Sequence, residues 1–313
     1  MAKNNGKFTL FFMLCALVLA LCLVIGMDKC EYTAKKAVFE TSNRVNTNLV
    51  ENNINDKKIV NTTASSKEIE VLCLMYHNVV ANTQKQGDYE VRVSTIEQDF
   101  IELKKLGYKC VNRKTLSNIV KNKKYGKYVM ITFDDGFYGV YKYMPALLEK
   151  YNMSCVVSVV GEFMDRQDKL TYKTRCSYMN TSEVKELSKN PRVEIALHSY
   201  DYHHIKDGRR GVKIKSGESK EIYKETFKTD TIKLATKLED IGIKAKTYCY
   251  PYGEFCRESE NVLKTLNYQM TMTCAEKINY LSEKDSLYLL GRINRSANCK
   301  NINNLISKAC NKK

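Results

Sequence analysis

The sequence predicts an α/β fold, a distorted (β/α) barrel of parallel strands preceded by an N-terminal transmembrane helix. From Ile69 onward, short apolar runs alternate with segments whose apolar residues recur at helical spacing, which is typical of a parallel sheet with crossover helices. The number of these units allows the sheet to close into a barrel, whose active site would lie at the carboxyl ends of the strands. Residues 8–27 carry no charged side chain, and a helix of about twenty apolar residues spans a bilayer core of roughly 30 Å.

The chain divides into four segments by composition. Residues 1–7 contain two lysines and predict a cytoplasmic tail, and residues 8–27 predict a transmembrane signal anchor. We favour an anchor over a cleaved signal because the apolar stretch is long and has no clear small-x-small cleavage site. Residues 28–68 are polar and contain no Gly or Pro, which predicts a stalk. Residues 69–313 then form the functional domain.

This order of segments predicts a single-pass protein of the cell membrane whose domain lies outside the cell. A basic start, an apolar span and a large polar remainder favour export of the remainder. Lys29, Lys35 and Lys36 follow the span, so the charge on the two sides does not by itself set the orientation. Cleavage of the span would instead make the domain a secreted protein.

The elements of the domain follow from periodicity. The helix expected in "STIEQDFIELKKLGY" has Ile96, Phe100 and Leu103 at helical spacing, with Ser94 as its expected cap and Glu97 three residues further on. The other helices are expected near 115–121, 138–151, 181–189, 219–240, 258–266 and 302–310. The strands are expected near 69–76, 109–111, 128–133, 154–160, 193–197, 246–250, 269–273 and 287–294.

The composition is that of a globular protein with a strong basic excess. The chain is 43% hydrophobic and 27% charged, with a formal net charge of +16, which favours an acidic partner surface. Much of the excess lies in "IKDGRRGVKIKSGESK", residues 205–220, which is either a solvated loop or a segment attracted to anionic wall polymers. Nucleic acid is not an expected partner, because the domain is exported and carries no nucleic-acid-binding motif. We expect a monomer.

The cysteine pattern excludes some metal and redox classes. Of twelve cysteines, two lie in the apolar span and none of the others forms a CxxC pair, which excludes zinc fingers and thioredoxin-like motifs. Cys73, Cys110, Cys155 and Cys249 lie in apolar, strand-like runs and are expected to be small buried hydrophobic residues. The remaining candidates for disulfide pairing are Cys256, Cys274, Cys299 and Cys310.

Polar residues follow four of the expected strands directly. In "VMITFDDGF", Asp134 and Asp135 come directly after the strand expected over 128–133, and His198 ends the strand in "VEIALHSYDYHH". Tyr252 lies in "YPYG" after a third strand, and His77 in "MYHNV" follows the first. Because the carboxyl ends of parallel strands meet at one face of the sheet, topology brings His77 to the other residues.

The adjacent carboxylates and the histidine cluster predict a metal site. Two neighbouring carboxylates repel each other, and a cation relieves that repulsion. Asp135, His198 and His203 form a two-His, one-carboxylate set that suits Zn²⁺, with nickel or cobalt as alternatives. Asp134 is then left as a general base. A simple turn at Asp134 and Asp135 with surface histidines is the alternative, and the histidine cluster argues against it.

The strand–"TFDDG"–helix unit followed by "HSYDYH" resembles the polysaccharide deacetylases of carbohydrate esterase family 4, the NodB homology domain. The resemblance runs from about 71 to 297. It implies that Asp134 is the catalytic base and Asp135 a metal ligand. The usual second histidine lies at i+4, but that position is Tyr202. The i+5 residue His203 is the expected ligand, in preference to His204, and this spacing resembles the poly-N-acetylglucosamine deacetylase branch.

Two departures from the wider family affect the remaining roles. The motif that usually supplies an arginine to orient the base is "YPYG" here, so Arg292 in "LLGRINRS" becomes the candidate. The last third of the chain has no histidine to act as an acid, and the resembling branch places the first-strand histidine, His77, in that role. A histidine that merely caps the strand is the alternative. The backbone N–H of Tyr252 is expected to stabilise the oxyanion.

These residues predict metal-dependent de-N-acetylation of a cell-surface polysaccharide that contains N-acetylglucosamine. The alternatives are a deacetylase of peptidoglycan or another acylated glycan, and a non-catalytic glycan-binding module of the same fold. The same ligand set binds Fe(II) in oxygenases, but the H-x-D pair typical of those enzymes is absent from the sequence.

Overall fold

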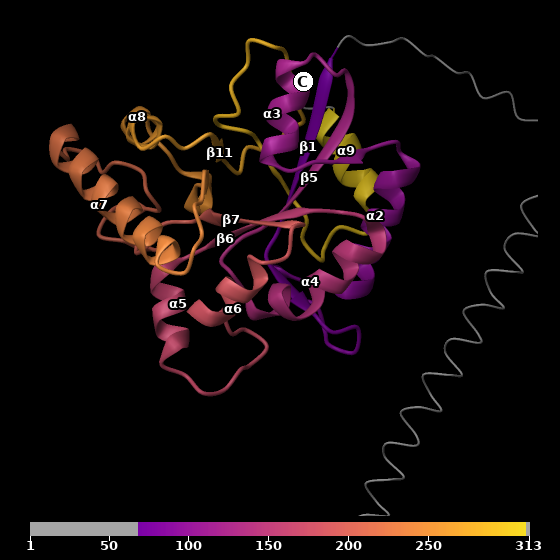
Figure 1. The fold of residues 1–313 in the computed structure, drawn as a ribbon, viewed down its shortest axis with the longest axis horizontal. Helices are drawn as coiled ribbons and strands as arrows, with labels where there is room; N and C mark the ends of the chain where they lie inside the picture. The colour runs from indigo at the N-terminus through magenta and orange to yellow at the C-terminus, as the bar shows by residue number, and fades with distance from the viewer. Residues whose placement is uncertain (1–67, 311–313) are drawn as a thin grey trace, which may run out of the picture. The chain divides into compact units, whose positions relative to one another are not determined.

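One curled sheet of mostly parallel strands forms the centre of the computed structural model, which describes residues 68–310 (Figure 1). The strands lie in the order β11-β10-β7-β6-β5-β1-β12, and β4 and β13 pair with β5 and β1 at its margins. Within the described residues, β12 is the strand of this sheet that runs antiparallel to its neighbour. The strands are β1 (Ile69–Tyr76), β4 (Lys109–Cys110), β5 (Gly126–Phe133), β6 (Cys155–Val159), β7 (Val193–Leu197), β10 (Thr247–Cys249), β11 (Met270–Met272), β12 (Asn279–Leu281) and β13 (Ile293–Asn294).

The register aligns the carboxyl ends of the central strands. β1 pairs with β5 over its whole length, which places Tyr76 beside Phe133. β6 pairs with β7 up to Val159 and Leu197. The residues that directly follow these strands therefore emerge at one end of the sheet.

The sheet is only partly closed. β13 pairs with the end of β1, whereas the chain just before β13 meets β11 through a single bridge between Met272 and Leu290. The sequence predicts one continuous strand over 287–294, but only its last two residues form a strand. The α/β fold with a curled parallel sheet is confirmed, and its closure is less complete than a full barrel would require.

Side chains along each strand point alternately to the two faces of the sheet, and they form two separate hydrophobic cores. On β1, Leu72 and Leu74 face the outer core with the surrounding helices, whereas Val71 and Cys73 face the inside of the curl. The inner cluster includes residues of α3 (Arg113–Lys121) together with Ile69 and Met270, the first residues of β1 and β11. Helix α3 thus covers the amino ends of the strands, which leaves the carboxyl ends open for a site.

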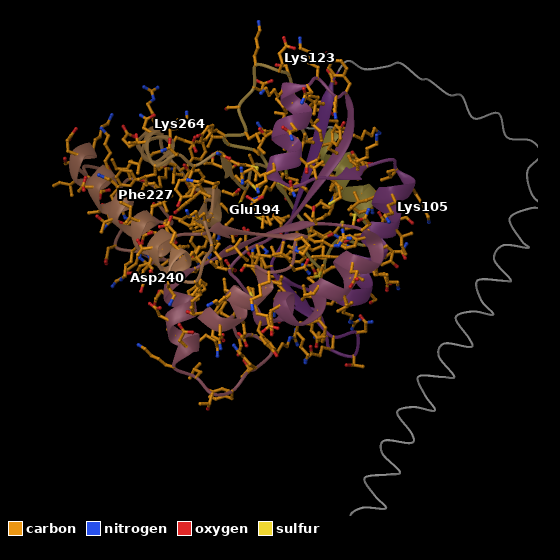
Figure 2. The ribbon with its side chains drawn as sticks, in the orientation of Figure 1. Lys105, Lys123, Glu194, Phe227, Asp240 and Lys264 are labelled. Atoms are coloured by element: carbon orange, nitrogen blue, oxygen red, sulfur yellow. The ribbon has the colours of Figure 1, made fainter. Side chains whose placement is uncertain are left out.

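The remaining helices pack around the outside of the sheet (Figure 1). Phe227 of α7 is buried in the outer core, while charged side chains such as Lys105, Lys123 and Lys264 point outward (Figure 2). These helices are α2 (Val93–Lys105), α4 (Tyr138–Tyr151), α5 (Gly161–Asp168), α6 (Thr181–Leu187), α7 (Lys220–Glu239), α8 (Arg257–Thr265) and α9 (Ile302–Cys310). Two small ribbons, β2 (Asn78–Val80) with β3 (Glu90–Arg92) and β8 (Ile205–Lys206) with β9 (Arg209–Arg210), complete the fold.

Several local predictions need correction. Helix α2 begins at Val93 with Arg92 at the cap position, and no side chain caps it, so the predicted cap at Ser94 is wrong. Helix α5, β12 and the two small ribbons were not predicted, because they are short and have no clear periodicity. Cys73, Cys155 and Cys249 are buried as predicted, and Cys110 is partly exposed. The four candidates for disulfide pairing, Cys256, Cys274, Cys299 and Cys310, are free thiols.

The predicted anchor at residues 8–27 lies outside the described residues, as does the predicted stalk apart from Glu68. Between residues 68 and 310, no helix is both long enough and apolar enough to cross a membrane.

Candidate active site

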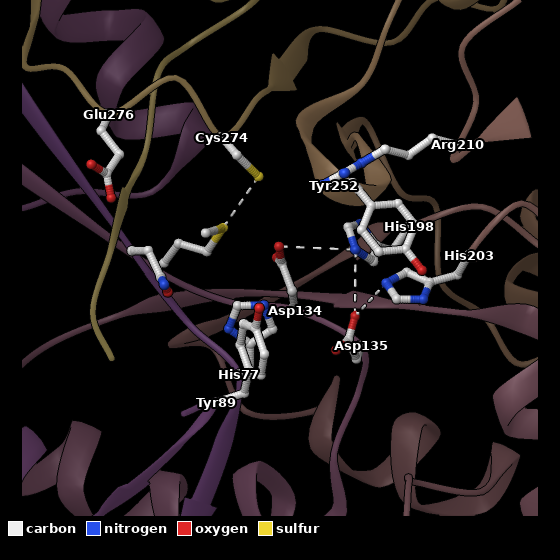
Figure 3. Close-up of a pocket in the computed structure, with 12 residues that line it drawn as sticks. His77, Tyr89, Asp134, Asp135, His198, His203, Arg210, Tyr252, Cys274 and Glu276 are labelled. Carbon is white, nitrogen blue, oxygen red and sulfur yellow. Dashed lines mark hydrogen bonds and ion pairs between the residues drawn. The ribbon is translucent and has the colours of Figure 1, made fainter. Parts of the chain in front are cut away.

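A cavity of about 490 Å³ lies at the carboxyl ends of the strands (Figure 3). Most of the residues predicted from strand ends line it, although they are far apart in the sequence. The lining residues are Met75, His77, Tyr89, Asp134, Asp135, His198, His203, Arg210, Tyr252, Cys274, Glu276 and Asn294.

Asp135, His198 and His203 converge on one point of this cavity. Asp135 Oδ1 lies 3.0 Å from His203 Nε2 and 3.5 Å from His198 Nε2. One potential ligand atom from each residue lies within 4.8 Å of the other two. The structure therefore brings together the three residues that the sequence predicts as metal ligands. His204 is not part of this group.

The turn that carries Asp135 has an unusual backbone. Asp135 has φ 70°, and Gly136 after it has φ 72°, a region that disfavours residues with a Cβ. A Cβ on Gly136 would also lie 3.1 Å from Cγ1 of Val159. The DG pair after β5 is therefore the sequence signal for a tight turn that directs Asp135 into the cavity.

The donor set fits a divalent metal ion. Asp135 Oδ1 is buried, accepts no hydrogen bond and faces two imidazole nitrogens, which is the arrangement that a shared cation would satisfy. His198 Nδ1 lies 2.7 Å from the carbonyl oxygen of Cys249. If Nδ1 carries the proton and donates to that carbonyl, Nε2 is left as a lone-pair donor toward the cavity.

The charges at this point follow from burial and from the neighbouring groups. Burial lowers the pKa of His198 to about 4, which favours the neutral imidazole that binds metals. Burial also disfavours charge on His203, but the close contact with the Asp135 carboxylate outweighs burial and raises the pKa of His203. Burial acts to raise the pKa of Asp135, and the contact with His203 reverses this and lowers it.

Asp134 is held by a fully buried arginine. Arg292 Nη1 and Nη2 donate to Asp134 Oδ1 and Oδ2 at 2.7 Å each, and Ser158 Oγ donates to Oδ1 at 2.7 Å. Arg292 is itself fixed by hydrogen bonds to the carbonyl of Thr273 and to the hydroxyl of Thr132. Burial acts to raise the pKa of Asp134, but Arg292 more than offsets it, so the pKa lies well below its ordinary value.

His77 and Tyr252 line the same cavity from different strands. The ring of His77 meets the ring of Tyr89 edge-on, with centroids 4.9 Å apart. Tyr252 has φ 58° in the short 3₁₀ turn Pro251–Gly253, and its ring packs 4.9 Å from that of His203. The guanidinium of Arg210 lies over the Tyr252 ring, 5.2 Å from its centroid.

Several residues of the site were not predicted. Ser158 holds Asp134, and no motif singles it out. Tyr89, Cys274 and Glu276 line the cavity from loops, where the sequence has no periodicity to place them. Arg292 was predicted from its position in the late strand, but its bidentate pairing with a residue 158 positions away requires the folded structure.

With this geometry in view, residues 121–271 match the family model of polysaccharide deacetylase. The chain carries a domain of the polysaccharide deacetylase family. It is homologous to the poly-beta-1,6-N-acetyl-D-glucosamine N-deacetylase of Escherichia coli (strain K12), with 24% identity over 238 residues. That alignment covers 69% of this chain and 35% of the relative. The chain therefore spans about a third of the length of the curated relative it matches.

Solved structures of deacetylases share the fold. A de-N-acetylase from Aggregatibacter actinomycetemcomitans has a TM-score of 0.62 at 23% identity and covers 76% of this chain and 100% of its own. IcaB from Ammonifex degensii has a TM-score of 0.61 at 22% identity and covers 73% and 93%. The Streptococcus pyogenes deacetylase PplD, solved with acetate, has a TM-score of 0.60 at 18% identity and covers 77% and 99%. These likenesses confirm that the fold is of the deacetylase type.

Proposed function

We propose that the domain is a metal-dependent N-deacetylase of a cell-surface polysaccharide that contains N-acetylglucosamine. The observation that carries the proposal is the convergence of Asp135, His198 and His203 beside Asp134 in one cavity. The N-deacetylase activity of the Escherichia coli relative supports the choice of substrate. So does the five-residue step from His198 to His203.

Asp135, His198 and His203 would hold the metal. A divalent ion held there would lower the pKa of water and polarise the acetamide carbonyl, and zinc is the first candidate for this donor set. Three protein ligands leave coordination positions open, as in catalytic rather than structural zinc sites.

Asp134 is positioned to accept a proton from the attacking water. Its Oδ2 lies 3.9 Å from His198 Nε2, on the side of the ligand residues. The bidentate pair with Arg292 keeps this carboxylate ionised at neutral pH, and it fixes the direction in which the free lone pairs point. The oxygen of water bonds to the acetyl carbon, and its proton passes to Asp134.

We assign His77 as the proton donor to the leaving amine. As the carbon–nitrogen bond breaks, the imidazolium of His77 donates a proton to the sugar nitrogen, which yields acetate and a glucosamine unit. The backbone N–H of Tyr252, in its left-handed turn, would donate to the oxyanion that forms on the acetyl oxygen.

We further propose that the domain lies outside the cell, tethered by residues 8–27. The uncharged stretch with two lysines before it supports this placement. Protease added to intact cells should then remove the domain and leave a short membrane-bound fragment. Protection of the whole chain until the cells are lysed would contradict the placement.

The substrate is tested by acetate release from a panel of purified polymers. The panel should include poly-β-1,6-N-acetylglucosamine, chitin oligomers and peptidoglycan, each incubated with zinc-loaded wild-type protein and with Asp134→Asn. We expect the wild-type protein to release acetate from poly-β-1,6-N-acetylglucosamine, and Asp134→Asn to release none. Preferential release from peptidoglycan would change the substrate, and bound metal with no release from any polymer would contradict the proposed activity.

A further inference from the structure

An exposed tyrosine stands at the edge of the cavity beside His77. The side chain of Tyr89 is 60% exposed, yet it lines the cavity and contacts the His77 ring edge-on. Figure 3 shows Tyr89 next to His77 with its hydroxyl end directed toward Asp134. None of the roles proposed above uses Tyr89. A large aromatic surface left open to solvent at this position therefore needs an explanation of its own.

The loop that carries Tyr89 is fixed by polar contacts at several points. Asn78 N–H donates to the carbonyl of Tyr89 at 2.9 Å, which ties Tyr89 to the residue that follows His77. The Glu90 carboxylate accepts from Asn78 Nδ2 at 3.2 Å and pairs with the guanidinium of Arg175. Asn78 is fully buried, and its Nδ2 also donates to the carbonyl of Arg175.

The same loop is braced on its other side. Asn298 Nδ2 donates to Asp88 Oδ1 at 3.2 Å, and Arg92 Nε donates to the carbonyl of Gln84 at 2.7 Å. An exposed aromatic ring on a loop held in this way is preorganised, so a ligand that covers it pays little entropy to order it.

We propose that Tyr89 is a stacking platform for a pyranose ring of the bound glycan, at the subsite next to the acetamide under attack. This inference rests on the proposed deacetylase function and adds a binding subsite to it. A pyranose presents an apolar C–H face that matches an aromatic face, while a tyrosine also keeps a polar end for water or a sugar hydroxyl. Because Tyr89 contacts His77, the platform lies beside the residue that we propose protonates the leaving amine of the same glycan.

The direct test is the binding of a β-1,6-linked N-acetylglucosamine oligomer, measured by calorimetry in a background that does not turn over. Asp134→Asn supplies that background, and chelator-treated wild type supplies a second one. Tyr89→Ala should weaken binding about tenfold or more, the loss expected for a stacked aromatic surface, and Tyr89→Phe should bind within about twofold of the parent. Tyr172→Ala is the matched control, because Tyr172 is 61% exposed and does not line the cavity.

Kinetics on the polymer distinguish a platform from a residue that only positions His77. A platform predicts a raised KM with kcat nearly unchanged for Tyr89→Ala. A lowered kcat with unchanged oligomer affinity would overturn the inference and make Tyr89 a positioning residue. The kcat for 4-nitrophenyl acetate, which carries no pyranose ring, should equal that of the wild type, and its loss would also overturn the inference.

The outcomes also separate this inference from the function on which it rests. Oligomer binding that depends on Tyr89, without acetate release by the wild type, would contradict the proposed activity alone. Acetate release by the wild type with equal oligomer affinity in Tyr89→Ala would contradict the platform alone. No oligomer binding by either parent background would overturn both.

Discussion

Replacing Arg292 with methionine should leave a buried carboxylate without its counter-charge. Arg292 is fully buried, and Asp134 is 2% exposed. The two share two hydrogen bonds of 2.7 Å. Removing one partner of a buried pair typically costs about 3–5 kcal/mol of the free energy of unfolding, because the remaining charge cannot reach water. For a domain of this size that corresponds to a fall in Tm of about 6–20 °C.

The assay is urea unfolding of the metal-free domain, followed by circular dichroism. Arg292→Met should lower the midpoint without changing the slope, which reports the surface exposed on unfolding. The double variant Arg292→Met/Asp134→Asn should recover much of the loss, because no charge is then left unpaired. Lys105→Met is the control. It removes the exposed pair of Lys105 with Glu102, and such pairs contribute under about 1 kcal/mol.

The loss of stability caused by Arg292→Met should also depend on pH. In the wild type, the pKa of Asp134 is held below its unfolded value of 3.8, so the pair stabilises the fold above that pH and loses its effect as the pH falls through the folded pKa. Without Arg292, burial raises the pKa of Asp134 above the unfolded value, so protonation at acidic pH removes the unpaired charge. The difference in stability between wild type and Arg292→Met should therefore shrink from pH 8 to pH 5. A loss below 1 kcal/mol at pH 8, or no recovery in the double variant, would refute this reasoning.

Three further predictions concern the cavity. His198→Ala should lose bound zinc, whereas Asp134→Asn should keep zinc and lose turnover, because a ligand and a base differ in this way; equal metal loss by mass spectrometry would make Asp134 a ligand. His203→Ala should lose more metal and activity than His204→Ala, because only His203 reaches the ligand carboxylate; the reverse order would move the ligand by one residue. His77→Ala should lower kcat about 10²–10⁴-fold at unchanged metal content, and an activated ester, whose leaving group needs no proton, should recover much of the rate. Equal loss on both substrates would make His77 a structural or binding residue.

Much of the fold could be predicted because its elements have strong periodicity. Helices 138–151 and 302–310 and strands 69–76 and 193–197 begin and end where the sequence places them. These elements have long apolar patterns or clear breakers at their ends. Helix α5 (Gly161–Asp168) was not predicted, because it is short, mostly polar and stabilised by contacts with distant segments.

The site could be predicted in part because a parallel sheet gathers its strand ends. That rule alone placed His77, Asp135 and His198 in one cavity. Contacts made by loop residues could not be predicted in this way. The position of Tyr89 depends on a ribbon held by Glu90 and on an arginine 85 residues further on, and no local pattern encodes such a contact.

The central claim is most directly tested by the stoichiometry of the reaction on poly-β-1,6-N-acetylglucosamine. The purified domain should release acetate and new free amines in a one-to-one ratio. Removal of metal by a chelator should abolish both products, and one equivalent of zinc should restore them. Undiminished acetate release from fully demetallated protein, or acetate without matching amines, would contradict the account.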